Sequence, residues 1–368
     1  MSYYADIRHR LHEHPQTAGN EQYAHDLIVG HLQGLHPDHV FTRVGGWGVV
    51  AVWDPSAQPA ESDPIPAVAF RADTDALPSG HRCGHDGHTT VMLRMAELTD
   101  QRPRPASHAT ILVWQPAEET GQGAGAVLES GILQRYNVRA IFGMHNIPGQ
   151  PLGSVVLCQD TFAAASTGIV YRLEGRQTHA STPEMGINPG LAVAEIIKRF
   201  DAFNTRVSAG QKIDDFRQST LICVHLGDPA FGTSAGHAEI MFTLRAFTNK
   251  AMEQLLAEAN HAVDEVAAAF GLSVSRMLQE PFHATENTPA CVAAVESAAR
   301  QLKYEVRQQA LPFRWSEDFA EYLIRFPGAM FGMGSGENQP ELHHPDYDFP
   351  DALVEPAAQL FFRLTTEC

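Results

Sequence analysis

A short apolar run leads directly into acids, imidazoles and a thiol in residues 67–88, which read AVAFRADTDALPSGHRCGHDGH. The apolar residues 67–70 predict a strand that is buried on both faces of an α/β sheet. Asp73 and Asp75 follow at the carboxyl end of this strand, where open α/β sheets bind their ligands. Only a few residues separate these acids from Cys83, so we expect the strand end and the later cluster to be neighbours in space.

The cluster itself, residues 81–88, contains one thiol, three imidazoles and one carboxylate, with two glycines between them. Thiolate and imidazole are ligands that Zn²⁺ and related ions prefer, and glycines allow the tight turns that bring neighbouring side chains together. Residues 89–98 resume a helical pattern, so the cluster is expected on the loop and first turn leading into a helix. The alternative interpretation is a polar surface loop.

Two further predicted strands release side chains of the same kinds. The strand at residues 109–114 is followed by Glu118 and Glu119, and the strand at residues 140–144 is followed by His145. Because the carboxyl ends of parallel strands share one edge of a sheet, these side chains and the cluster are expected to form one site. Adjacent residues of an extended chain point in opposite directions, so both glutamates can face this site only if the chain turns there.

The segment at residues 166–279 has a different pattern. Its predicted elements follow the order βαββαβ, which is that of a ferredoxin-like unit. The expected strands lie at 169–174, 220–226, 238–247 and 272–278, and the expected helices at 189–203 and 251–270. We therefore predict a mixed-sheet α/β catalytic domain, formed by residues 1–165 and 280–368, with this ferredoxin-like lid domain inserted into it.

Length and composition limit the class of protein. A chain of 368 residues is expected to form about two domains, and no apolar run predicts a membrane span. The 26 Lys and Arg against 43 Asp and Glu give a net charge of −17, which argues against nucleic acid as a partner. The five cysteines are odd in number and far apart, which indicates a reducing compartment, with the cytoplasm expected. The amino terminus lacks the apolar segment of a secretory signal.

Hydrolysis of an amide requires an activated water, an electrophile for the carbonyl oxygen and a proton carrier to the leaving nitrogen. The ligand types for two divalent ions about 4 Å apart are supplied by Cys83, His85, Glu119, His145 and a late histidine, which is either His343 or His344. Two ions on five side chains leave open coordination positions, which are typical of catalytic rather than structural sites.

Two residues of the predicted inserted domain are further candidates. His179 lies in the first strand-to-helix loop of this domain. A histidine carried by a second domain, or by that of a partner subunit, could donate to the developing oxyanion when the domains close. The alternative is an ordinary exposed loop residue. Arg245, on a later strand, could bind a substrate carboxylate.

Several blocks of this sequence resemble those of a known family. In order, they are RADTDALP, CGHDGH, QPAEET, GMHNIPGQPLGSV, THASTP, SEDF and LHHP. Together they resemble the M20 metallopeptidases, specifically the amidohydrolase branch with its bacterial aminoacylases, N-acetyldiaminopimelate deacetylases and plant auxin-conjugate hydrolases. The resemblance covers nearly the whole chain. It implies a catalytic α/β domain, an inserted lid domain through which two subunits commonly pair, and two divalent metal ions, usually zinc or manganese.

The resemblance also implies a role for each residue that matches a family motif. The metal ligands would be Cys83, His85, Glu119, His145 and His343. Glu118 would be the general base, and His179 would stabilise the transition state. Asp75 would orient His85 from behind the metal site.

The chain departs from the family at two places. Only residues 79–82 separate the DALP and CGHDGH blocks, so a loop that lines the substrate cleft in the family is missing. Gly232 stands where the family often has a substrate-contacting asparagine. We therefore predict a dinuclear metal-dependent amidohydrolase that cleaves an N-acyl amino acid or a related small amide, without specifying the acyl group.

Three alternative functions remain open at this point. The first is a thiol-dependent hydrolase with Cys83 as nucleophile and His85 as base. The second is a zinc nucleobase deaminase, although the CxxC ligand pair of that class is missing. The third is a noncatalytic binding or assembly protein in which the shortened loop marks lost activity.

Overall fold

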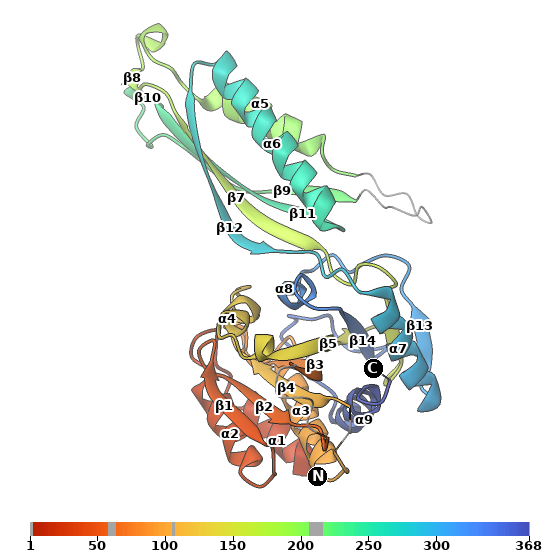
Figure 1. The fold of residues 1–368 in the computed structure, drawn as a ribbon. Helices are drawn as coiled ribbons and strands as arrows, with labels where there is room; N and C mark the ends of the chain where they lie inside the picture. Colours follow the sequence, from red (N-terminus) through yellow and green to blue (C-terminus); the bar gives the residue numbers. More distant parts are fainter. Residues whose placement is uncertain (1–2, 58–63, 105–106, 206–215, 368) are drawn as a thin grey trace. The chain divides into compact units, whose positions relative to one another are not determined.

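The computed structural model describes residues 3–57, 64–104, 107–205 and 216–367. The chain forms two compact units (Figure 1). The main unit consists of Met1–Phe162, Thr285–Ala310 and Glu317–Cys368, and the inserted unit of Ala163–Ala284 and Leu311–Ser316. Among the helices of the described residues, none is long and apolar enough to cross a membrane.

The main unit contains an eight-stranded mixed sheet in the order β1-β2-β4-β3-β5-β14-β6-β13. Its strands are β1 (His39–Val44), β2 (Gly48–Trp53), β3 (Ile65–Asp73), β4 (Ala109–Gln115), β5 (Tyr136–Pro148), β6 (Val155–Leu157), β13 (Val306–Gln308) and β14 (Gly328–Gly336). The three strands predicted to carry the site, β4, β3 and β5, lie side by side and run parallel. The mixed character comes from β2, which is antiparallel to β4, and from β6, which is antiparallel to β14.

Helices pack against this sheet and form the core of the main unit. They are α1 (Tyr3–His12), α2 (Gln22–Leu32), α3 (His85–Asp100), α4 (Gly123–Glu129), α7 (Pro289–Gln301), α8 (Ala320–Leu323) and α9 (Val354–Leu364), with short 3₁₀ turns at Leu133–Arg135 and Asp351–Leu353. The central helix α3 contacts β3, β4, α1 and α9. Phe70 on β3 lies 5.8 Å from Phe142 on β5 and 5.5 Å from Phe361 on α9, measured between ring centroids. Helix α8 is only four residues long.

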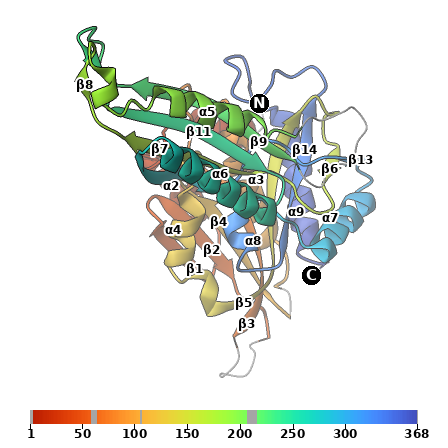
Figure 2. The same cartoon turned by 90° about the horizontal axis from the view of Figure 1, so that it is seen from above.

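The inserted unit has the chain order β7 (Ala165–Glu174), α5 (Gly190–Asp201), β9 (Arg217–Leu226), β11 (His237–Ala246), α6 (Asn249–Ala269) and β12 (Ser273–Phe282). These strands form an antiparallel sheet in the order β12-β7-β11-β9. The helices α5 and α6 lie together along the sheet (Figure 2), where Phe200 stacks on Phe242 at 4.0 Å between ring centroids. The predicted fold, a mixed α/β domain with an inserted ferredoxin-like βαββαβ domain, is confirmed.

A small ladder completes the inserted unit. Its two strands are β8 (Thr178–His179) and β10 (Thr233–Ser234), which pair in antiparallel fashion, with a 3₁₀ turn at Pro183–Met185. The segment Leu311–Ser316 also belongs to this unit, because Ala164 N donates to the carbonyl oxygens of Phe313 and Trp315.

Candidate metal centre

The parallel arrangement of β3, β4 and β5 brings the predicted site residues to one edge of the main sheet. Cys83 lies in the loop after β3, and His85 opens α3. The loop between them is tight, because Gly84 has φ 95° and a Cβ there would lie 2.7 Å from the Asn146 side chain. His145 lies within β5, which continues three residues further to Pro148. The edge therefore collects a thiol and two imidazoles from three segments.

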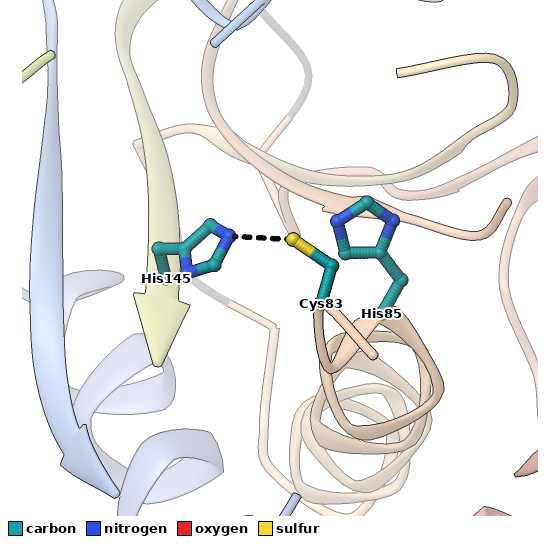
Figure 3. Close-up of side chains that lie close together, drawn as sticks. All are labelled: Cys83, His85 and His145. Carbon is teal, nitrogen blue, oxygen red and sulfur yellow. Dashed lines mark hydrogen bonds between the residues drawn. The ribbon is translucent and has the colours of Figure 1, made fainter. Parts of the chain in front are cut away.

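These three side chains form a buried group (Figure 3). Cys83 Sγ lies 3.6 Å from His145 Nε2, and the donor atoms of Cys83, His85 and His145 all lie within 4.8 Å of one another. The Nδ1 atom of each imidazole faces a backbone oxygen. His85 Nδ1 lies 3.0 Å from the Asp75 oxygen, and His145 Nδ1 lies 2.9 Å from the Asn146 oxygen. In the neutral form of each ring, Nδ1 therefore carries the proton, and the Nε2 lone pair remains for a ligand inside the cluster.

The glutamate pair and the late histidine reach the same group. The donor atoms of Cys83, Glu119 and His343 lie within 4.8 Å of one another, and so do those of His85, Glu118 and Glu119. His85 Nε2 is 4.0 Å from Glu118 Oε2 and 4.0 Å from Glu119 Oε1. All five predicted ligands and the predicted general base thus lie together in the main unit.

The turn after β4 allows both glutamates to face His85. Ala117 adopts a left-handed backbone with φ 56°, so the chain is not extended at this point. Its amide donates to Glu21 Oε1 at 2.9 Å, and the Glu119 amide donates to Asp75 Oδ2 at 3.0 Å. Gly121 N closes the turn on the Glu118 carbonyl oxygen at 2.8 Å. The predicted turn is therefore present. Glu21 and Asp75, which lie outside it, hold it in place.

The donor set fits divalent metal ions. His85 Nε2 and Glu119 Oε1 are buried and have no hydrogen-bond partner among the described residues. A buried polar atom without a partner is costly, and a metal ion would satisfy both atoms at once. Thiolate, imidazole and carboxylate are the donors that Zn²⁺ and related ions take.

Burial shifts the pKa of several side chains in the cluster. Burial lowers the pKa of His145 well below its usual range, which keeps this ring neutral, the form that binds metals. Burial raises the pKa of the Cys83 thiol, which disfavours the free thiolate that a cysteine nucleophile needs. Burial also raises the pKa of Glu118 well above its usual range, and the carboxylates of Glu317 and Asp318 raise it further.

A buried ionic network lies beside the metal-ligand cluster. The fully buried Arg71 on β3 donates to Asp73 Oδ2 at 2.5 Å and to Asp318 Oδ1 at 2.7 Å. The other carboxylate oxygen of Asp73 lies 2.6 Å from His88 Nδ1, and His88 Nε2 lies 2.5 Å from Asn146 Oδ1. These contacts tie β3 to α3 and β5 behind the cluster.

Arg71, Asp318 and Glu21 were not predicted as residues of the site. One signal was available, because Arg71 interrupts an apolar run, and a charge in a buried strand requires partners. Asp318 lies in the SEDF block, which was noticed only as part of the resemblance. Nothing in the sequence around Glu21 marks it as a partner of the glutamate turn.

Asp75, His344 and the shortened approach to Cys83 also have defined contacts. His85 Nδ1 lies 3.0 Å from the backbone oxygen of Asp75 and 3.5 Å from its carboxylate Oδ1. His344 Nδ1 accepts from Asp346 N at 3.1 Å, and the adjacent His343 contributes to the cluster. Gly80, with φ 103°, donates from its amide to the Leu77 carbonyl oxygen at 2.9 Å, so the short segment before Cys83 begins with a tight turn.

His179 and Arg245 lie in the inserted unit. His179 is exposed on β8, and its Nδ1 accepts from Ser181 N at 3.1 Å. The proton of its neutral ring is therefore on Nε2. Arg245 Nη1 on β11 donates to the Arg314 carbonyl oxygen at 2.7 Å and lies 3.1 Å from Ser316 Oγ.

Comparison with known proteins defines the class of the chain. The model of Peptidase family M20/M25/M40 matches residues 69–367. The chain therefore belongs to this family, as the resemblance predicted. With its amidohydrolase relatives, this makes it a hydrolase that acts on C–N bonds.

Individual relatives match almost the whole chain. N-acetylcysteine deacetylase from Bacillus subtilis is 27% identical, covering 98% of this chain and 95% of the relative. IAA-amino acid hydrolase ILR1-like 5 from Arabidopsis thaliana is 29% identical, and the match covers 98% of this chain and 85% of the relative. Among solved structures, the Bacillus subtilis protein YXEP, described as a dinuclear metal binding peptidase of the M20 family, has a TM-score of 0.83 at 26% identity, covering 98% and 96% of the two chains.

Proposed function

We propose that this protein cleaves the amide bond of an N-acyl amino acid, or of a closely related small amide, with two divalent metal ions and an activated water. The convergence of Cys83, His85 and Glu119 with His145 and His343 carries this proposal. The names of the deacetylase and of the IAA-amino acid hydrolase support the choice of substrate class.

Those five side chains would hold the ions. Zinc is the best match to a donor set that includes a thiolate, and manganese is the alternative that the family resemblance implies. Bound there, the ions would polarise the scissile carbonyl and lower the pKa of the attacking water. Glu118 then takes a proton from this water and delivers it to the leaving nitrogen. Its raised pKa suits this exchange, because a more basic carboxylate takes the proton from water more readily and keeps it until the leaving nitrogen accepts it.

We propose that the inserted unit acts as the lid. Because the Nε2 atom of His179 carries the ring proton, it can donate to the developing oxyanion when the lid closes, from the same subunit or from a partner. Arg245 is proposed to bind a substrate carboxylate. This role requires nitrogens other than the Nη1 atom that contacts Arg314 and Ser316.

We also propose that the chain pairs as a homodimer through the inserted unit. The edge strand β9 exposes Leu221 at 42% and Ile222 at 58%, and an exposed apolar edge strand is a common site of strand pairing between chains.

The cytoplasm is the proposed compartment. Cys83, Cys158 and Cys223 are free thiols, as expected in a reducing environment. The fifth cysteine, Cys368, lies outside the described residues.

The function is tested by chelation and by substitution. Removal of the metal should abolish hydrolysis of a panel of N-acyl amino acids, and Zn²⁺ or Mn²⁺ should restore it. Glu118→Gln should lower kcat by about 10²–10⁴-fold with the metal content unchanged, and Glu129→Gln, at the exposed end of α4, should have no effect. Full activity of a metal-free preparation, or of Glu118→Gln, would refute the proposal. Absence of turnover in the metal-loaded protein would favour the noncatalytic alternative.

A further inference from the structure

The loop that carries Glu118 and Glu119 runs from the end of β4 to the start of α4. The Asp318 carboxylate contacts both of its ends. Gln115 Nε2 donates to Asp318 Oδ1 at 2.9 Å and to Oδ2 at 2.8 Å, and Ala124 N donates to Oδ2 at 2.9 Å. The Asp318 side chain is only 1% exposed, so water does not compete for these contacts.

The backbone of the same residue contacts the proposed general base. Asp318 N donates to Glu118 Oε1 at 3.4 Å. One residue thus joins the two ends of the glutamate loop to the carboxylate at its centre. Asp318 is not among the predicted metal ligands.

Arg71 fixes Asp318 in this position. Its Nη2 donates to Asp318 Oδ1 at 2.7 Å, and its Nε donates to Gln115 Oε1 at 2.9 Å. The guanidinium is planar and always charged, so its donors hold a fixed geometry. It also balances the negative charge of a carboxylate that is buried beside Glu118.

We propose that Asp318 is a positioning residue that holds Glu118 in the orientation required for proton transfer, an inference that rests on the proposed function. The expected effect follows from geometry. A displacement of about 1 Å in a catalytic group costs about 10²-fold in rate. Because Asp318 touches the loop and not the donor atoms, its loss should affect kcat more than metal binding.

Asp318→Asn tests this role with little change in volume. The new amide must place its NH₂ either against Arg71 Nη2 or against Gln115 Nε2 and Ala124 N, which are all donors. We expect kcat to fall about 10²-fold, with KM and the number of bound metal ions unchanged. Wild-type kcat in this variant would overturn the proposal.

Asp100→Asn is the matched control. Asp100 is a largely buried carboxylate of the main unit that accepts from Trp53 Nε1 at 3.0 Å and from His36 N at 2.7 Å. This variant should lose thermal stability without a change in kcat. If Asp318→Asn fails to fold, Gln115→Met tests the same role, because it removes the hydrogen bonds from β4 to the Asp318 carboxylate. It should lower kcat with the metal retained, and wild-type kcat would overturn the proposal.

A double-mutant cycle separates positioning from a general structural effect. If Asp318 acts through Glu118, Asp318→Asn should cause no further loss of kcat in the Glu118→Gln background. An equal fold-loss in both backgrounds would show that Asp318 acts independently of Glu118. If the proposed function itself were wrong, the result would be distinguishable, because the Glu118→Gln variant alone would then retain activity.

Discussion

Ala117 lets two adjacent glutamates face one site, and it does so in a left-handed backbone with φ 56°. This conformation costs an L-residue about 1–2 kcal/mol, and glycine avoids most of that cost but loses about 0.5–1 kcal/mol in entropy. We therefore expect Ala117→Gly to keep or slightly raise the free energy of unfolding, measured by urea titration. Ala117→Val should lower it by more than about 1 kcal/mol, because β-branched residues rarely adopt positive φ. A large loss in the glycine variant would contradict the assigned backbone.

His108, just before β4, makes stability depend on pH. It is 5% exposed, its Nε2 lies 2.9 Å from the Thr365 carbonyl oxygen, and burial lowers its pKa. Between this lowered value and the unfolded value of about 6.5, the unfolded chain binds a proton that the folded protein does not. The stability contributed by neutral His108 is therefore present above about pH 6.5 and is lost as the pH falls through that window.

His108→Gln should remove this pH dependence while keeping an N–H donor for Thr365. The difference in unfolding free energy between wild type and variant should be largest at about pH 7.5 and smaller at about pH 5.5. Comparing the two proteins at each pH cancels effects that both share, including loss of metal ions. A difference that stays constant or grows in acid would show that folding does not lower the pKa of His108.

The residues of the cluster differed in how well sequence could predict them. Cys83, His85 and Glu119 could be proposed as donors because their side-chain chemistry is itself the signal. Arg71 and Asp318 could not, because their importance arises from a contact between residues 247 positions apart. A charge within an apolar run predicts that some partner exists, but the fold decides which one.

At the scale of elements, the strands of the site could be located because they are buried apolar runs, as β4 is buried along its whole length. Their bounds were too short, because β5 extends on both sides of the predicted 140–144 and includes His145. The strand β1 was missed because most of it is exposed, and β6 was missed because its buried apolar run is only three residues long. Helix α8 begins only at Ala320. Glu317 and Asp318 precede it and pair with Arg71 in the buried network.

Replacing a glycine by alanine should have opposite effects on stability at two helical positions, because one is closely packed and the other is open. A Cβ on Gly87 in α3 would lie 2.2 Å from the Phe349 ring, whereas a Cβ on Gly125 in α4 meets no atom within 4 Å. Gly87→Ala should therefore destabilise by about 1–3 kcal/mol through overpacking. Gly125→Ala should stabilise by about 0.5–1 kcal/mol. Thermal or urea unfolding measures both, and equal effects in the two variants would contradict the close approach of Phe349.

At the scale of the whole molecule, the two edges of the inserted sheet predict different behaviour. The middle of β9 exposes Leu221 and Ile222 without a charged neighbour, whereas β12 exposes Leu278 between Arg276 and Glu280. Charges on an edge strand protect it from pairing with other chains. Ile222→Lys should therefore convert the proposed dimer to a monomer in analytical ultracentrifugation, and Leu278→Lys should not. A wild-type monomer, or equal effects of both variants, would refute pairing through β9.

The central claim is that five side chains of the main unit hold two metal ions for amide hydrolysis. Anomalous diffraction from crystals of the Zn²⁺- or Mn²⁺-loaded protein tests it most directly. Two peaks about 4 Å apart are predicted, bounded by Cys83, His85, Glu119, His145 and His343. A single peak, no peak, or peaks only at another group such as His12, Asp86 and Asp348 would contradict the claim.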